Sequence, residues 1–179
     1  MSLRVLIGGE YSGTIRDAFT ARGHYAMSCD FSPTTSPGPH YQGDWADVEG
    51  AGWDLAIFHR TCTFMANSGA KHIYAGMNKD NGLNEDRWLQ MGRDAWAFWK
   101  HRKTCPVPFA AWENPVMLGY AQLMIGKPEQ TVQPWWFATD PDGPDNVKKA
   151  TCWWTKGGLP KLRPTGLLDG STARDEVFR

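Results

Sequence analysis

The feature that most constrains the fold is an apolar strand at the start of the chain that breaks into a glycine-rich turn. Leu3–Gly8 is short, β-branched and apolar, which is typical of a strand buried on both faces of a parallel sheet. Gly9 and Gly13 break this run, and Ser12 is a candidate cap for a helix that begins near Gly13 and stops at Gly23. This succession predicts the first half of a strand–helix–strand unit.

Strand and helix patterns alternate along the rest of the chain. Further strands are expected at 24–29, 53–58, 107–112, 131–137 and 150–155, and further helices at 84–102 and 118–125. Proline-rich residues 31–43 are expected to form a loop, and residues 60–82 a long functional loop or lid. This order predicts an α/β, three-layer Rossmann-like fold with a mostly parallel sheet and an antiparallel edge hairpin. We expect one domain over 1–166 and a polar, disordered tail over 167–179.

The amino-acid composition argues against a strongly basic nucleic-acid-binding protein, a common zinc site and a membrane span. Of the 179 residues, 41% are hydrophobic and 21% charged, and 19 basic residues balance 19 acidic ones, so no global positive field draws the chain to nucleic acid. The four cysteines form no C-x-x-C pair, which predicts a reduced cytoplasmic protein without a metal site. No signal-peptide layout is visible, and no apolar run approaches the roughly 20 residues that a membrane span needs.

Unusual residues follow the first two strands, where an open parallel sheet binds ligands. The loop of Gly9, Tyr11, Ser12, Gly13 and Thr14 is small and leads into a helix N-terminus, which favours a carboxylate or phosphate. A tight turn without a ligand explains these glycines equally well.

Acidic residues beyond this loop strengthen the cofactor interpretation. Asp30 ends the second strand about 20 residues further on, where an acid typically accepts hydrogen bonds from ribose hydroxyls, although a solvated loop aspartate is the alternative. Asp44 and Trp45 form an acid–aromatic pair able to bind an adenine, or else a simple turn.

A second group of candidates follows the next two strands. Arg60 and Cys62 come after the strand at 53–58, and Glu113 and Asn114 after the strand at 107–112. A thiolate can attack an electron-poor carbon while a protonated carboxyl holds the substrate ring. Cys62 on its own fits a buried inert thiol better, and its pairing with Glu113 is what favours chemistry.

In combination these residues resemble the cytosine-C5 DNA methyltransferases, in the short form found in phages and prophages. The resemblance covers Arg4 to about Pro164 and runs through Arg4–Phe19, Ser28–Asp30, Gly43–Asp44, Cys62, Glu113–Pro115, and the later segments 133–137 and 149–154.

That resemblance implies a class I methyltransferase fold that binds S-adenosylmethionine. The loop at 11–14 would hold the methionine part, Asp30 the ribose, Phe31 one adenine face and Asp44 the adenine amino group. Cys62 would add to C6 of a pyrimidine in DNA, and Glu113 would hydrogen-bond the ring. Such enzymes flip their target base out of the duplex.

Three departures from the family pattern leave alternatives open. Arg60 and Thr61 stand where the family has two prolines, so Arg60 either lowers the pKa of Cys62, reaches a phosphate, or marks a site that has lost catalysis. No Gln-x-Arg-x-Arg element is present, and Arg60, Lys148 and Lys149 are the candidates for its arginine. The chain is also too short for a separate target-recognition domain.

The functional alternatives follow from these departures. The leading interpretation is methylation at C5 of cytosine in DNA, with a free pyrimidine nucleotide as the alternative acceptor. A catalytically silent protein that binds S-adenosylmethionine or nucleic acid is a second interpretation. A dinucleotide oxidoreductase is weaker, because G-x-G-x-x-G is absent. Recognition would come from residues 60–82 or from a partner, and the ten tryptophans leave room for a homodimer surface.

Overall fold

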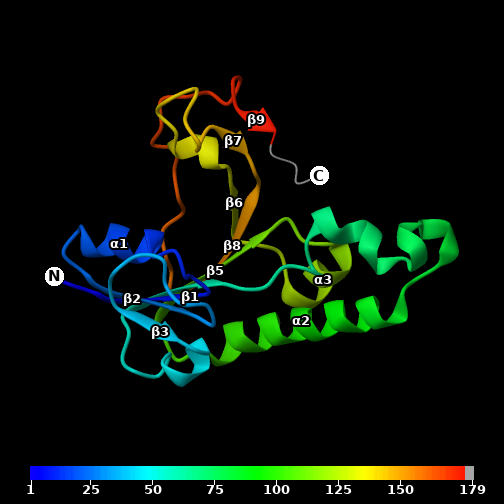
Figure 1. The fold of residues 1–179 in the computed structure, drawn as a ribbon, viewed down its shortest axis with the longest axis horizontal. Helices are drawn as coiled ribbons and strands as arrows, with labels where there is room; N and C mark the ends of the chain where they lie inside the picture. The colour runs from blue at the N-terminus through cyan, green and yellow to red at the C-terminus, as the bar shows by residue number, and fades with distance from the viewer. Residues whose placement is uncertain (176–179) are drawn as a thin grey trace. The chain divides into compact units, whose positions relative to one another are not determined.

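The structure is a computed structural model that describes residues 1–175 (Figure 1). The described chain separates into two compact units, each presented by itself below. Unit 1 comprises 1–60, 101–113 and 155–159, and unit 2 comprises 61–100, 114–154 and 160 onward. The sequence predicted one domain over 1–166, and this boundary stays a prediction.

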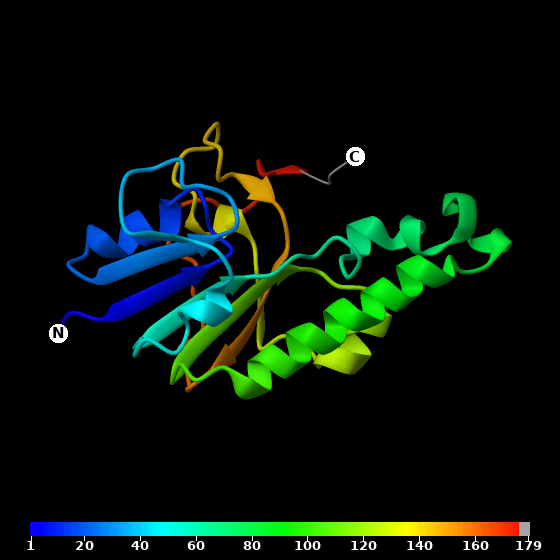
Figure 2. The same cartoon turned by 60° about the horizontal axis from the view of Figure 1, so that its bottom comes forward.

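Unit 1 is built on parallel strands. They are β1 (Arg4–Gly8), β2 (Tyr25–Asp30), β3 (His40–Gln42), β4 (Leu55–His59) and β5 (Phe109–Pro115, to Glu113 in this unit), in the order β3-β2-β1-β4-β5. Figure 2 shows β1 and β2 running side by side. Since β1 pairs with β2 on one side and with β4 on the other, the strand order reverses at β1 and β4. Such a switch point is where ligands bind in open α/β sheets.

The apolar runs of the sequence form the core of unit 1. Val5, Leu6 and Ile7 of β1 are completely buried, as expected for a strand with parallel neighbours on both sides. Helix α1 (Thr14–Thr20) contributes Ile15 and Phe19, which pack against this core. The strand and the helix are therefore held together by apolar burial, which fixes the position of the loop between them.

Unit 2 contains the long helix α2 (Glu85–Thr104, up to Lys100 in this unit), which Figure 2 shows beside α3 (Gly119–Ile125). The indole of Trp88 meets the Tyr120 ring edge-on, with centroids 4.9 Å apart. Before α2, residues 60–82 form the short helices η2 (Asn67–Ile73), η3 (Ala75–Met77) and η4 (Lys79–Asn81). The expected long loop is therefore a series of 3-10 turns.

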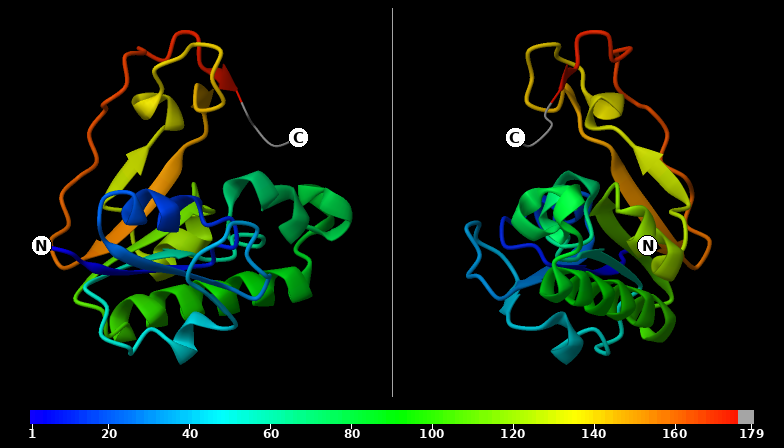
Figure 3. Two further views of the ribbon diagram at one scale, coloured as in Figure 1. Left: turned by 60° about the vertical axis from the view of Figure 1, so that its left-hand side comes forward. Right: turned by 90° about the vertical axis from the view of Figure 1, so that its right-hand side faces the viewer.

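The rest of unit 2 is an antiparallel hairpin and a small second sheet. Strands β6 (Gln130–Val132) and β8 (Thr151–Lys156) pair antiparallel (Figure 3). Between them lie η5 (Pro134–Phe137) and β7 (Val147–Lys148). The strand expected at 131–137 ends at Val132 because Pro134 cannot donate a ladder hydrogen bond and begins a 3-10 turn instead.

The described part of the expected tail, residues 167–175, contains one short strand. Residues 174–175 form β9 (Arg174–Asp175), which pairs with β7. Asn146 donates from Nδ2 to Thr172 Oγ1 at 3.0 Å, and Gly170 lies against the Trp135 indole. The expected disorder of the tail stays a prediction, and 176–179 lie outside the described residues.

The predicted α/β class, the mostly parallel sheet and the antiparallel edge hairpin are confirmed. A short strand, β3, lies inside the segment expected to be a loop at 31–43, where it pairs with β2. Over residues 1–175, no helix combines the length and the apolar character needed to cross a membrane.

Candidate functional site

The loop after β1 is organised by Glu10, a residue that sequence reasoning passed over. Its carboxylate is buried at 6% exposure and accepts the amide hydrogens of Ile15 at 2.6 Å and Arg16 at 3.2 Å. Ser12 was expected to cap this helix, but Gly13 occupies the cap position. The Ser12 hydroxyl instead accepts from the Thr14 amide at 3.3 Å and donates to Thr14 Oγ1 at 3.1 Å. Glu10 takes over because its longer side chain reaches from the strand end to the open amides of the first turn.

The two glycines of the loop are required by the fold itself. Gly9 has φ 78°, and a Cβ there would lie 2.2 Å from the backbone oxygen of His59. Gly13 has φ 77°, and a Cβ there would lie 2.3 Å from Nη2 of Arg16. Close packing and positive φ explain both glycines, so their presence alone does not indicate a ligand.

A pocket opens at the switch point, at the carboxyl ends of β1 and β4. Its volume is about 440 Å³, within the range of small-molecule sites. It is lined by Gly9, Glu10, Tyr11, Ser12, Thr14, Ile15 and His59. The side chain of Tyr11 is 51% exposed, and the hydroxyls of Ser12 and Thr14 are also exposed. The loop predicted to hold a cofactor therefore lines a pocket at the expected edge of the sheet.

Asp30 lies next to this loop. The amides of Gly9 and Glu10 donate to the backbone oxygen of Cys29, at 2.7 and 3.1 Å, so Asp30 follows at the same sheet edge. One carboxylate oxygen of Asp30 accepts from the Ser32 amide at 2.8 Å. Phe31 is 71% exposed, so its ring is open for stacking.

Asp44 and Trp45 already have partners within unit 1. Asp44 Oδ1 caps η1 (Trp45–Asp47) by accepting from the Ala46 amide at 3.0 Å. The Trp45 indole stacks on the His101 ring, with centroids 5.8 Å apart and an interplanar angle of 15°. The exposed Asp44 carboxylate has a second oxygen that this cap does not use, and Trp45 has a protein ring as its stacking partner.

Arg16 fixes the segment that connects β2 to β3. Its side chain is fully buried, and its guanidinium donates to the backbone oxygens of Ser36 and Pro37 at 3.0 and 3.1 Å. It also donates to Ser28 Oγ at 3.2 Å and to Asp17 Oδ1 at 2.8 Å. This set of acceptors satisfies a buried charge, and it holds α1, β2 and the loop together.

His59 and Glu113 form a pair at the ends of the adjacent strands β4 and β5. They face each other in the strand register, and His59 Nδ1 lies 3.0 Å from Glu113 Oε2. Both side chains are mostly buried, with 25% and 22% exposure. His59 Nε2 is buried, and no group within residues 1–175 partners it. The sequence predicted Glu113 as a site residue paired with Cys62, but the contact with His59 was not predicted, because strand register is not visible in the sequence.

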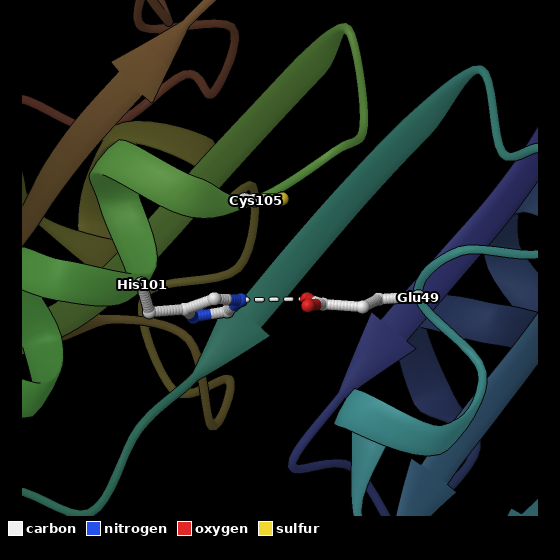
Figure 4. A group of neighbouring side chains, drawn as sticks. All are labelled: Glu49, His101 and Cys105. Atoms are coloured by element: carbon white, nitrogen blue, oxygen red, sulfur yellow. Dashed lines mark hydrogen bonds and ion pairs between the residues drawn. The ribbon is translucent and has the colours of Figure 1, made fainter.

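Arg60 is held by a buried network at the end of α2. Its Nη1 donates to Nδ1 of His101 at 3.2 Å, and its guanidinium carbon lies 5.2 Å from the centroid of the Trp45 ring. On the other side of the imidazole, Nε2 lies 2.8 Å from Glu49 Oε2 (Figure 4). Arg60 therefore has protein partners in unit 1, and its predicted action on the Cys62 pKa or on a phosphate stays a prediction.

The donors around His101 define its tautomer. Trp112 Nε1 and Arg60 both donate to Nδ1, so the proton sits on Nε2 and is donated to Glu49. Burial lowers the pKa of His101, and the Arg60 charge adds to this, while Glu49 opposes it. The imidazole is thus a neutral link between an arginine and a glutamate.

Glu49, His101 and Cys105 bring three potential metal ligands within 4.8 Å of one another. A metal on Nε2 requires the ring's proton on Nδ1. Two N–H donors already point at Nδ1, so a proton there would face them directly. The geometry does not suit a metal ion, and the hydrogen-bonded network accounts for the cluster.

Cys62 and Asn114 belong to unit 2. Cys62 is half-buried, and its backbone oxygen accepts from the amides of Met65 and Ala66 at 2.9 and 2.8 Å. Asn114 is fully buried. The segment after Cys62 pairs with the segment after Asn114 through an antiparallel bridge between Ala66 and Met117. Their predicted catalytic roles stay predictions.

Comparison with known proteins adds little to this description. No protein-family model matches the chain, and no curated protein matches it. Two solved structures of WbdD, one in complex with a kinase inhibitor, align with 87% of this chain at 13% and 12% sequence identity and a TM-score of 0.42. The chain spans 36% of the length of WbdD. Similarity at this level carries no argument about function.

Proposed function

We propose that this chain binds S-adenosylmethionine at the switch-point pocket and transfers its methyl group to C5 of a cytosine in DNA. The observation that carries the proposal is the open pocket at the ends of β1 and β4, with Asp30 at the end of the neighbouring strand β2. Ligand-binding α/β proteins place a ribose-binding acid at this point. The resemblance to cytosine-C5 DNA methyltransferases supplies the identity of the cofactor and of the acceptor.

The residues at the pocket fit this cofactor. Tyr11, Ser12 and Thr14 are exposed on the loop and would bind the methionine part, whose carboxylate suits hydroxyl and amide donors. Asp30 uses one carboxylate oxygen for the Ser32 amide, so its other oxygen would accept from the ribose hydroxyls. The exposed Phe31 ring would cover one adenine face, and Asp44 would accept from the adenine amino group. When bound, the cofactor supplies an electrophilic methyl group.

The acceptor chemistry is assigned to Cys62 and Glu113. The Cys62 thiolate would add to C6 of the pyrimidine, which makes C5 nucleophilic towards the methyl group. Glu113 would hydrogen-bond the ring through Oε1, the oxygen that does not face His59. Asn114 follows Glu113 in β5 and would help to hold this strand end. In this proposal, Arg60 supports the start of the Cys62 segment through its contacts with His101 and Trp45.

The net charge of the chain is zero, so overall electrostatic attraction to the DNA phosphates does not explain DNA binding. We propose that residues 60–82 or a partner protein supply it, with a homodimer as one form of partner. A cytoplasmic location fits this proposal, because the acceptor DNA is found there.

Calorimetry with S-adenosylmethionine tests the cofactor assignment. Wild type should bind, and Asp30→Ala should weaken binding at least tenfold, as expected for two lost ribose hydrogen bonds. Asp142→Ala, an exposed aspartate in unit 2, is the matched control and should bind like wild type. Equal affinities for all three proteins would contradict the assignment of Asp30.

Transfer of labelled methyl groups tests the acceptor. Duplex DNA, single-stranded DNA and free deoxynucleotides are offered in parallel, and DNA should carry the label. Cys62→Ser should abolish transfer but leave cofactor binding intact, whereas Ser171→Ala, at an exposed serine outside residues 60–82, should retain transfer. Label on free nucleotides alone would replace the polymer by a nucleotide substrate. Cofactor binding without transfer to any acceptor would favour the catalytically silent alternative.

A further inference from the structure

We propose that His59, held by Glu113, is the proton acceptor that removes the C5 hydrogen after methyl transfer. The inference rests on the proposed function, and it assigns a role to a residue that neither the sequence pattern nor the resemblance singled out. It starts from the His59–Glu113 contact of 3.0 Å and from the unpartnered Nε2 of His59.

The geometry of this pair is that of an imidazole oriented by a carboxylate. When Glu113 is ionised, His59 Nδ1 donates to Oε2, and the free electron pair is then on Nε2. The carboxylate also stabilises the imidazolium that forms when Nε2 takes up a proton. Such an arrangement makes a histidine an effective general base.

Nε2 of His59 is buried, and no group within residues 1–175 forms a hydrogen bond with it. A buried polar atom without a partner is unfavourable, because it has lost its hydrogen bonds to water and has gained none in the protein. His59 lines the switch-point pocket together with the loop at 9–15. Its backbone oxygen is in close contact with Gly9, so the pocket wall holds the residue in place. A substrate group in the pocket would give Nε2 its partner.

The proposed chemistry requires a base at this stage. Addition of Cys62 to C6 and methylation at C5 leave a saturated ring that still carries the C5 hydrogen. For turnover, the C5–H bond breaks and its proton passes to Nε2 of His59. The electron pair of that bond forms the C5–C6 double bond, and the C6–S bond breaks to release the Cys62 thiolate. Proton and electrons balance without a further reagent.

The chain places the base close to the nucleophile along the sequence. Cys62 follows His59 by three residues, so their Cα atoms lie no more than about 11 Å apart. Glu113 serves both steps in turn: Oε1 gives its proton to the ring nitrogen during the addition and takes it back as the C6–S bond breaks. Between these two transfers the Glu113 carboxylate accepts from Nδ1 of His59, which keeps Nε2 free to take up the C5 proton.

The test uses His59→Asn in the full chain. The asparagine amide matches the position of Nδ1 and can still donate to Glu113, but it offers no nitrogen that can take up a proton. His59→Asn should carry out one methyl transfer and then stall, and mass spectrometry should show DNA bound covalently to Cys62 with the methyl group added. Wild type on the same unmodified DNA should show turnover and little adduct. Asp142→Asn, which changes an exposed side chain of unit 2 outside residues 60–82, is the control.

The outcomes separate the inference from the proposed function. Wild-type turnover together with normal turnover and no adduct in His59→Asn would overturn the assignment of His59 alone. No methyl transfer by wild type would overturn the proposed function, and the inference with it. Binding of S-adenosylmethionine by His59→Asn shows that the variant is folded. If it does not bind, His59→Gln is used in the same way, since it fills more of the imidazole volume.

A second readout needs no cofactor. Reversible addition of Cys62 makes C5 able to exchange its hydrogen with water, and this exchange also requires a base. His59→Asn should slow the loss of tritium from 5-tritiated cytosine in DNA at least tenfold relative to wild type. A purely structural role for His59 would leave the exchange rate of the folded variant unchanged.

Discussion

Trp112 donates its indole N–H to Nδ1 of His101 at 3.1 Å, and this contact fixes the protonation state of the imidazole. Both residues are buried, and Arg60 donates to the same nitrogen at 3.2 Å. A proton on Nδ1 would replace two favourable contacts by two donor–donor repulsions. His101 is therefore stable in this fold as the neutral ring, and several consequences can be measured.

The free energy of unfolding should decrease as the pH is lowered, because the unfolded chain binds a proton at His101 more readily than the folded protein does. Burial lowers the pKa of His101 in the folded protein below the ordinary value for histidine, about 6.5. The unfolded state therefore binds the proton first, so the contribution of His101 is complete above about pH 6.5 and is lost as the pH falls through the lowered folded pKa. Urea denaturation from pH 7.5 to 5.5 should show a decreasing unfolding free energy.

The matched variants for this experiment are His101→Gln and His72→Gln. His101→Gln should be less stable at pH 7.5 by about 2 kcal/mol, because the Trp112 and Arg60 donors lose their acceptor, but its stability should change less with pH. The exposed His72 should leave the wild-type profile unchanged. Identical pH profiles for all three proteins would show that His101 does not control this transition.

Chelation should leave the protein unaffected. Glu49, His101 and Cys105 lie within 4.8 Å of one another, but the donors at Nδ1 oppose a metal on Nε2. We expect the melting temperature to be the same with EDTA and with one equivalent of zinc, in differential scanning fluorimetry. A zinc-dependent rise in the melting temperature that Cys105→Ser removes would contradict the tautomer argument.

Replacing Arg16 should destabilise the protein strongly. Arg16→Lys keeps the charge but lacks the planar fork that reaches the Ser36 and Pro37 oxygens together with Ser28. We expect a loss of about 3 kcal/mol in the free energy of unfolding, as for other disrupted buried networks. Arg22→Lys at an exposed site is the control, and it should change stability by less than about 0.5 kcal/mol. Similar effects of both changes would show that the fork geometry does not matter.

Substitution by alanine should destabilise the protein by different amounts at two glycines that have nearly the same φ. Gly23 has φ 82°, and a Cβ there would meet nothing within 4 Å, so Gly23→Ala should be unfavourable by about 1 kcal/mol from the backbone alone. Gly9→Ala should lower the free energy of unfolding by about 2 kcal/mol more than Gly23→Ala does, because its Cβ would overlap the His59 backbone oxygen. Thermal unfolding of both variants gives this difference, and equal losses would mean that the loop can move away.

The four cysteines should react with an alkylating reagent at different rates. Burial, together with the nearby acids Asp44 and Asp30, raises the pKa of Cys29 to about 12, and burial also raises the pKa of Cys105. Cys152 is buried, whereas Cys62 is half-buried. In the folded protein at pH 8, iodoacetamide should therefore label Cys62 first, as peptide mass spectrometry can show. Rapid labelling of Cys29 before Cys62 would contradict the described burial.

The strands and the edge that carries the site could be predicted because they follow from local patterns. Continuous apolar runs such as Val5–Ile7 occur where a strand is buried on both faces, and acidic or glycine residues mark where it ends. Strand β3 was missed because its three residues are polar and lie in a proline-rich segment. It is a strand only because it pairs with β2.

The contacts within the site depend on pairings that no local pattern contains. Glu10 was missed because glutamate is not among the usual capping residues. The burial of Arg16 was missed because arginine is almost never fully buried without dedicated partners. The contact between His59 and Glu113 follows from the register of β4 and β5, which is set by the packed sheet.

The hydrogen bonds of the Arg16 guanidinium affect how a ligand would bind at this edge of the sheet. Because protein groups alone satisfy it, the segment after Asp30 is already ordered before any ligand arrives. Binding would then require little loss of conformational entropy from this loop, and affinity would come mainly from contacts. The edge of the sheet is preorganised: its shape is established during folding and does not have to be induced by the ligand.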